Sequence, residues 1–274
     1  MVSFAIRAAR IERKPSAAAK WAGRIAWFSL VLLITAVALH RFGFIETIPF
    51  FWTVVLAGGL ATLGLLTAIL AFWRMWEYGF TGFWSAFWGL LISVLVLAPY
   101  GIAGVLYVTR PALTDVMTDV VTPPEFALAP ALRQPPMNPI GPLSQAAGLE
   151  HMEAYPELAG RRYEQPREQV MAALMAVLDQ KGWERLGSSD ETGEVIPEEA
   201  ADGEGRTVVE AAATAPILGL PFDAAIRVEE RDNATFVDMR VVSRYGSHDL
   251  GFNAMEIQSF LRDLDEALTE MAGG

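Results

Sequence analysis

The sequence predicts an α-helical membrane anchor with three transmembrane helices, followed by an α+β domain whose four-stranded antiparallel sheet carries helices on one face. Three early stretches lack any charged residue, namely Ile25–His40, Thr47–Trp73 and Tyr78–Thr109. A hydrocarbon core about 30 Å thick needs roughly 20 apolar residues per helical crossing. The later sequence is charged and shows both helical and strand-like apolar periodicity, which is typical of a folded domain outside the bilayer.

The crossings are expected at about residues 21–41, 50–74 and 83–108, so that residues 1–109 form the anchor with its N-terminal segment. The first uncharged run has only 16 residues, so Lys20 and Arg24 must extend to the interface for it to span. This run also resembles a signal peptide, with Ala36-Val37-Ala38 as a cleavage site. Cleavage would leave two crossings and the same side for the C-terminal domain.

Charge divides the chain sharply. Residues 1–109 hold eight Lys/Arg and three Asp/Glu, a net +5, whereas residues 110–274 hold 13 and 29, a net −16. The basic residues ahead of the first crossing are Arg7, Arg10, Arg13, Lys14, Lys20 and Arg24. By the positive-inside rule, the N-terminus is expected in the cytoplasm and the C-terminal domain outside, in the periplasm if the host is Gram-negative. So acidic a domain argues against a nucleic-acid partner.

Residues 110–154 predict a proline-rich linker, because residues 110–150 alone hold eight of the 16 prolines. Proline fixes φ and removes a hydrogen-bond donor, so we expect an extended, largely non-helical tether. The α+β domain is then expected over residues 155–272. The chain has no cysteine, so this domain depends on its hydrophobic core without disulfides, and cysteine-based metal or redox chemistry is excluded.

The predicted order of elements in the domain is helix, four strands, helix. Gln165–Lys181 has helical apolar spacing between Pro166 and Gly182. A hairpin turn is predicted at Arg231-Asp232-Asn233-Ala234. The expected strands are Trp183–Ser188, Arg206–Ala213, Ala224–Glu230 and Thr235–Ser243, and the last helix is Leu250–Met271.

The third crossing places small residues four apart, at Ser85, Gly89 and Ser93. Such residues let helices approach closely. Two interpretations stay open: packing inside the three-helix bundle, and a docking face for another membrane protein. The crossings hold no charged residue apart from Arg24 at the margin, which favours an anchor over a transporter.

Strand alternation sets the candidate site. It places Asp238 and Arg240 on one sheet face, opposite Val237, Met239 and Val241, and Arg227 of the neighbouring strand joins them. We expect these charges, with Arg244, on an exposed or half-exposed surface, either as structural ion pairs or as an anion-binding platform. Asp249 is expected to cap the last helix. The candidate ligand-binding residues are Arg227, Asp238, Arg240, Ser243, Arg244, His248, Asp249 and Asn253.

Catalytic and metal signals are weak. His248 lies near Ser243 and Ser247, but no nucleophile elbow surrounds either serine. The acidic residues have no recognisable metal-ligand spacing. No catalytic residue, metal or cofactor is therefore predicted.

Several segments of the C-terminal part form a recognisable set. The most specific is Ser243-Arg244-Tyr245-Gly246-Ser247-His248-Asp249-Leu250-Gly251 with Asn253-Ala254, and weaker ones are Tyr155-Pro156-Glu157-Leu158, Glu210-Ala211 and Phe222-Asp223. Together they resemble the family catalogued as domain of unknown function 1499. Thr114–Asp119 with Pro123-Pro124-Glu125-Phe126 resembles the family's entry motif, and the three-crossing arrangement resembles an alphaproteobacterial version. Ala224 and Val241-Val242 depart from the pattern. The resemblance implies no activity.

The expected function is a binding or scaffolding module, anchored in the inner membrane, for an envelope component. The expected partners are the lipid bilayer and another membrane or envelope protein. The alternative is a hydrolase acting on an envelope substrate through Asp238, His248 and Asp249.

Overall fold

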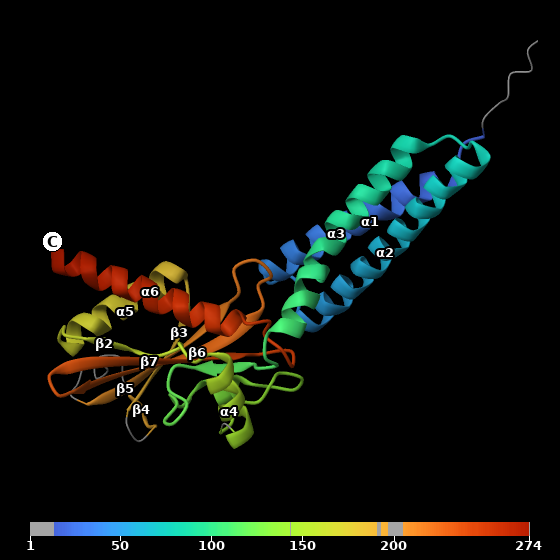
Figure 1. The fold of residues 1–274 in the computed structure, drawn as a ribbon. Helices are drawn as coiled ribbons and strands as arrows, with labels where there is room; N and C mark the ends of the chain where they lie inside the picture. Colours follow the sequence, from blue (N-terminus) through green and yellow to red (C-terminus); the bar gives the residue numbers. More distant parts are fainter. Residues whose placement is uncertain (1–13, 143, 191–192, 197–204, 274) are drawn as a thin grey trace, which may run out of the picture. The chain divides into compact units, whose positions relative to one another are not determined.

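The computed structural model describes residues 14–142, 144–190, 193–196 and 205–273 (Figure 1). The chain divides into two compact units, one up to Ile102 and one from Ala103 to the end. Most of the N-terminal segment expected in the cytoplasm, including Arg7, Arg10 and Arg13, lies outside the described residues.

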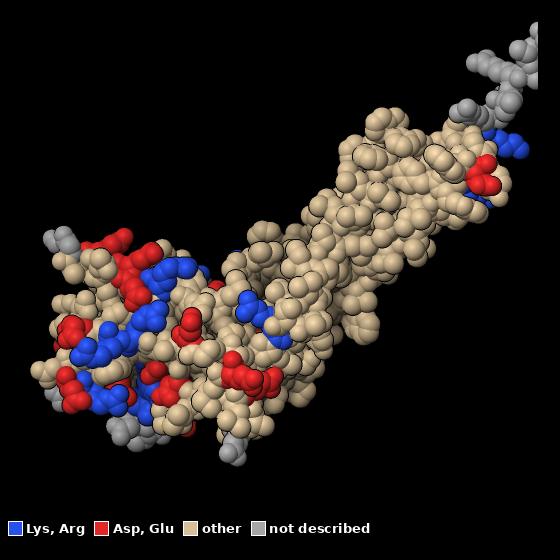
Figure 2. Space-filling model, in the orientation of Figure 1, with Lys and Arg blue, Asp and Glu red and all other residues tan. Residues whose placement is uncertain are grey.

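Three long helices confirm the predicted anchor: α1 (Ala17–Arg41), α2 (Thr47–Tyr78) and α3 (Phe83–Thr109), whose last turns belong to the second unit. Each is long and apolar enough to cross a membrane. The side chain of Ser16 caps α1, and Gly79 ends α2 in the left-handed conformation. Figure 2 shows the visible surface of these helices as largely uncharged, whereas charged side chains of both signs cover the second unit.

Small residues bring the three helices together within the first unit. A Cβ added at Gly89 of α3 would lie 2.8 Å from the backbone carbon of Ala22 in α1. A Cβ at Gly64 of α2 would lie 2.7 Å from Oγ of Ser93 in α3. The small residues of the third crossing thus serve packing inside the bundle, the first of the two interpretations.

The second unit is built on an antiparallel sheet in the order β1-β7-β6-β5-β3-β4. Strand β2 also pairs with β7, along the same edge as β1. The strands are β1 (Asp115–Met117), β2 (Arg161–Tyr163), β3 (Glu184–Ser189), β4 (Val195–Ile196), β5 (Arg206–Thr214), β6 (Pro221–Arg231) and β7 (Ala234–Ser243). The four expected strands are β3, β5, β6 and β7. The prediction of only four was wrong, because β1, β2 and β4 are too short to show a period of two in the sequence.

The apolar face of the sheet is covered by α5 (Arg167–Lys181) and α6 (Phe252–Gly273), as predicted (Figure 1). Alternate residues of β5, β6 and β7 form one buried core with these two helices, and Trp183 stacks on Phe260 at a ring distance of 5.3 Å. The predicted hairpin turn is present between β6 and β7. Asp232 and Asn233 have φ of 51° and 60° there, which matches the twist of a two-residue turn.

The opposite face of the sheet is covered by residues 114–142, which we call the covering segment. It contains β1 and a 3₁₀ turn, η1 (Ala129–Leu132), and α4 (Gln145–Ala154) follows it. Figure 1 shows this green stretch and α4 on the side of the sheet away from α5 and α6. The expectation of an extended tether over residues 110–154 is corrected, because residues of this stretch bond to charged side chains of β5, β6 and β7.

Candidate functional site

The covered face carries alternating charged residues at matching register. Arg227 of β6 lies directly opposite Asp238 of β7, and Ala225 lies opposite both Arg240 and Glu210 in its two neighbours. Arg227, Asp238 and Arg240 therefore share one sheet face, as strand parity predicted. Their expected exposure was wrong, because the side chains of Arg227 and Arg240 are only 5% and 4% accessible beneath the covering segment.

Arg227 joins the sheet to the start of the covering segment. Its Nη2 donates to Oδ2 of Asp119 at 2.8 Å and to Oδ2 of Asp238 at 2.6 Å, and its Nη1 donates to the carbonyl oxygen of Thr122 at 2.5 Å. Burial raises the pKa of Asp119, but hydrogen bonds from Thr122 and Arg227 outweigh it and bring that pKa to about 2. The hydroxyl of Thr118 donates to Asp238 and accepts from the N–H of Met239.

Arg240 donates hydrogen bonds to three residues of the covering segment. Its guanidinium makes a two-point contact with Asp115, from Nε at 2.9 Å and from Nη2 at 2.6 Å. It also donates to the carbonyl oxygens of Pro124 and Gly141, and it lies 5.5 Å from the ring centre of Phe126. Four acceptors around one guanidinium leave Arg240 little capacity to bind a further anion.

Asp223 is fully buried between two arginines. Arg244 Nη2 lies 2.6 Å from its Oδ1, and Arg133 Nη2 of the covering segment lies 2.6 Å from its Oδ2. Burial lowers the pKa of Arg133, although the charge of Asp223 opposes this. Arg133 also donates to the carbonyl oxygens of Asn138, Val242 and Ser243. Arg244, expected on an exposed or half-exposed surface, is half-buried and forms an ion pair with the buried Asp223.

Glu210 of β5 binds the part of the covering segment that leads into η1. Its carboxylate, which is wholly buried, accepts from the backbone N–H groups of Ala127, Leu128 and Ala129 at 2.6 to 3.1 Å. These amides lie just before and at the start of η1, where a carboxylate is favoured. Leu128 rests on β3 at Gly187, where a Cβ would lie 2.7 Å from Leu128 Cδ1.

Ser243, Asp249 and Asn253 form a second group, at the start of α6. The carboxylate of Asp249 accepts from the N–H groups of Gly251 and Asn253 at 2.8 and 2.9 Å, so its predicted capping position is observed. Burial raises the pKa of Asp249, and these two bonds oppose the rise. Ser243 Oγ donates to Asn253 Oδ1 at 3.0 Å, and Asn253 Nδ2 donates to the carbonyl oxygen of Thr114. The side chains of Ser243, Asp249 and Asn253 therefore stabilise the start of α6 and its contact with Thr114.

His248 has both ring nitrogens engaged. Its Nδ1 accepts from the N–H of Leu250 at 2.9 Å, so in the neutral ring the proton lies on Nε2. That nitrogen is 3.2 Å from the carbonyl oxygens of both Tyr107 and Arg110. The ring also packs 4.8 Å from that of Tyr107. The structure places His248 as a link to the end of α3.

A sequence model of the family described as Protein of unknown function (DUF1499) matches residues 115–264. This chain belongs to the DUF1499 family. No curated protein and no solved structure matches it. The DUF1499 match begins at Asp115, inside the covering segment, and so includes both sides of every ion pair described above.

Sequence reasoning missed five charged residues of this DUF1499 domain: Asp115, Asp119, Arg133, Glu210 and Asp223. A signal was present for two of them, because Glu210 and Asp223 interrupt the apolar residues of their strands at positions that face away from the core. The other three lie in the covering segment, which has no regular period.

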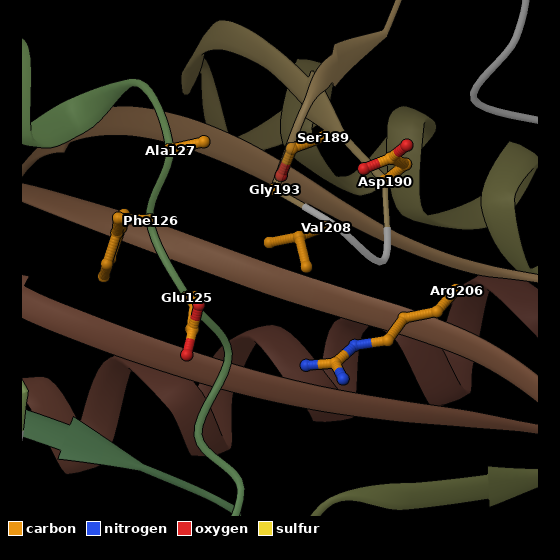
Figure 3. A pocket seen from close by; sticks show the side chains of 8 residues that line it. All are labelled: Glu125, Phe126, Ala127, Ser189, Asp190, Gly193, Arg206 and Val208. Atoms are coloured by element: carbon orange, nitrogen blue, oxygen red, sulfur yellow. The ribbon is translucent and has the colours of Figure 1, made fainter.

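A cavity of about 250 Å³ opens between the covering segment and the end of β3 (Figure 3). Figure 3 shows the guanidinium of Arg206 directed toward the side of the cavity that Glu125 forms. The lining is completed by Phe126, Ala127, Ser189, Asp190, Gly193 and Val208. Among the described lining residues, one arginine stands with two acidic residues, so this part of the cavity offers no surface of a single charge. In the described ranges, no group of three or more His, Asp or Glu could hold a metal ion.

Proposed function

We propose that this DUF1499 protein is a binding or scaffolding module, anchored in the bacterial inner membrane, that presents its domain in the periplasm. Its partner in this proposal is an envelope component or another membrane protein. The observation that carries the proposal is the pairing of the charges on the covered face. Arg227, Arg240 and Arg244 each bind carboxylates of this same chain, so their role is to close the domain.

The contacts of the remaining polar residues support a non-catalytic role over the alternative hydrolase. A general base needs a ring nitrogen free to take a proton, whereas both nitrogens of His248 are used. Asp249 is occupied by two backbone amides, and Asp238 by Arg227 and Thr118.

Charge distribution supports the proposed topology. Six basic residues precede the first uncharged stretch, Ile25–His40, and the domain carries the acidic excess. That excess also disfavours a nucleic-acid partner. Reporter fusions test the topology: a fusion after Gly274 should be active only as a periplasmic reporter, and one after Arg74 only as a cytoplasmic reporter. A cytoplasmic C-terminus would refute the periplasmic assignment.

Chemical crosslinking and pull-down of the tagged full chain from membranes tests the function. A binding module should recover the same lipid, polymer or protein with wild-type protein and with His248→Ala. Deletion cells complemented with His248→Ala should also match the wild type, whereas a hydrolase that uses His248 as base would lose nearly all activity. Ser247→Ala, next to it on an exposed position, is the matched control for disturbance of the loop. Loss of complementation by His248→Ala at normal protein level would favour the hydrolase.

A further inference from the structure

The loop that joins β5 to β6 exposes apolar side chains at one end of the sheet. Residues 215–220 contain no charged residue, and the side chains at their tip are Ile217, 80% exposed, and Leu218, 40% exposed. Single exposed apolar residues are common, but two neighbours at the tip of a hairpin in an acidic domain form a directed apolar surface.

This loop has a defined shape. The N–H of Ala215 donates to the carbonyl oxygen of Leu220 at 2.8 Å, and the N–H of Gly219 donates to that of Ala215 at 2.9 Å. Gly219 has φ of +69°, a conformation that favours glycine. In Figure 1 the loop is the orange turn that projects beyond β5 and β6. These hydrogen bonds within the loop leave fewer backbone groups without a partner, which lowers the cost of moving the loop from water into an apolar environment.

The loop lies at the end of the sheet where the chain arrives from α3. Pro221 accepts from the N–H of Arg244, and Phe222 pairs with Ser243, so the loop stands beside the β7–α6 connection. His248 of that connection contacts Tyr107 at the end of α3. All of these residues belong to the second unit, which begins at Ala103.

The end of α3 has the features of a membrane boundary. Arg110 is the first charged residue after the uncharged stretch Tyr78–Thr109. Tyr107 and Val108 in the last turn are 60% and 83% exposed. Tyrosine and arginine at the end of an apolar helix are typical of the interface between hydrocarbon and water. A bilayer that holds α3 therefore ends near Tyr107–Arg110.

We propose that residues 215–220 insert Ile217 and Leu218 into the interface of the bilayer that α3 crosses. The partner of this apolar tip is lipid, because the tip lies at the same end of the sheet as the last turn of α3, where the bilayer ends. The domain is then held at the membrane in two places, by its peptide connection to α3 at Arg110 and by the loop. This inference does not depend on which side of the membrane the domain occupies.

Single-cysteine labelling tests the proposal directly, because the chain has no native cysteine. The full chain carrying Ile217→Cys is labelled with a polarity-sensitive fluorophore and placed, one copy each, in nanodiscs of phosphatidylethanolamine and phosphatidylglycerol. Quenching is measured with nitroxide-bearing lipids and with aqueous iodide. Asp232→Cys in the β6–β7 turn, at the opposite end of the sheet, is the matched water-exposed control, and Val108→Cys is the membrane-boundary control.

The labelled Ile217→Cys protein should emit at shorter wavelength than the Asp232→Cys protein. Its quenching by lipid nitroxide should be several-fold stronger and its quenching by iodide several-fold weaker. Leu218→Cys should give the same pattern, and neither substitution removes a buried side chain. Iodide quenching at residue 217 equal to that at residue 232, without nitroxide quenching, would overturn the proposal. Protection from iodide without nitroxide quenching would also overturn it, because protein and not lipid would then cover the tip.

Discussion

The two faces of the sheet are closed in different ways. On one face, α5 and α6 bury apolar side chains, with Ile226, Met239 and Phe260 fully inaccessible. On the other, the covering segment buries a layer of ion pairs in which Glu210 and Asp223 are just as inaccessible. Apolar burial stabilises roughly in proportion to area and in any orientation. Buried charges stabilise only when each finds its partner, because desolvation otherwise exceeds the attraction.

This difference teaches that the covered face depends on particular pairs, whereas the apolar face depends on volume and pattern. A substitution on the apolar face should weaken the whole domain. A substitution on the covered face should first release the covering segment, whose hold on the sheet consists largely of Asp115, Asp119, Arg133 and the amides bound by Glu210.

The largest effect is expected for Phe260→Ala on the apolar face. Loss of this buried ring, which stacks on Trp183, should lower the free energy of unfolding by about 3–5 kcal/mol. Amide hydrogen exchange of α5 and α6 in the full chain, measured as a function of denaturant concentration, gives the change. Met255→Ala on the exposed side of the same helix is the control and should change it by no more than about 0.5 kcal/mol. Equal effects of the two would contradict the assignment of the faces.

Asp223→Ala should come next, at about 3 kcal/mol, because Arg133 and Arg244 would be left without their buried carboxylate. Unlike Phe260→Ala, it should raise amide hydrogen exchange first in residues 127–138, ahead of α5 and α6. The exposed pair Arg162–Glu164 supplies the control, since Glu164→Ala should change stability by about 1 kcal/mol or less. Uniform exchange across the domain in Asp223→Ala would show that the covering segment is not a separate element.

The smallest effect concerns pH and His151. Its Nε2 accepts from the N–H of Met117 at the edge strand β1, and burial lowers its pKa from 6.5, although Asp115 opposes this. As pH falls below 6.5, the unfolded chain takes up a proton that the folded chain does not. Stability is therefore present above pH 6.5 and is lost as pH falls, by at most about 1.4 kcal/mol per pH unit.

His151→Gln, whose amide oxygen retains an acceptor, should reduce the fall in melting temperature between pH 7.5 and 5.5. Asp119 does not interfere, because with a pKa of about 2 it contributes stability that is lost only below its ordinary 3.8. Asp249, whose pKa is raised, is present in both proteins, so its contribution to the pH dependence cancels when the two are compared. An unchanged fall in His151→Gln would assign the pH dependence to other groups.

Strand parity was enough to place Arg227, Asp238 and Arg240 on one face, because alternation along a strand is a local property. It could not show that these groups are buried. Their partners come from far along the chain: Asp115 is 125 residues from Arg240, and Arg133 is 90 residues from Asp223. The prolines of the covering segment correctly disfavoured a long helix, but they do not distinguish a free tether from one held on a sheet.

Local sequence patterns were sufficient to predict the three apolar helices, the four longer strands, the β6–β7 turn and the cap of α6. Each depends on residues within one element or a few positions beyond it. The structure adds that residues 114–142 close the polar face, that the charged residues are paired there, and that the loop at residues 215–220 lies at the same end of the sheet as the connection from α3. The physical reason is that pairing and burial depend on contacts between distant segments, which no local periodicity records.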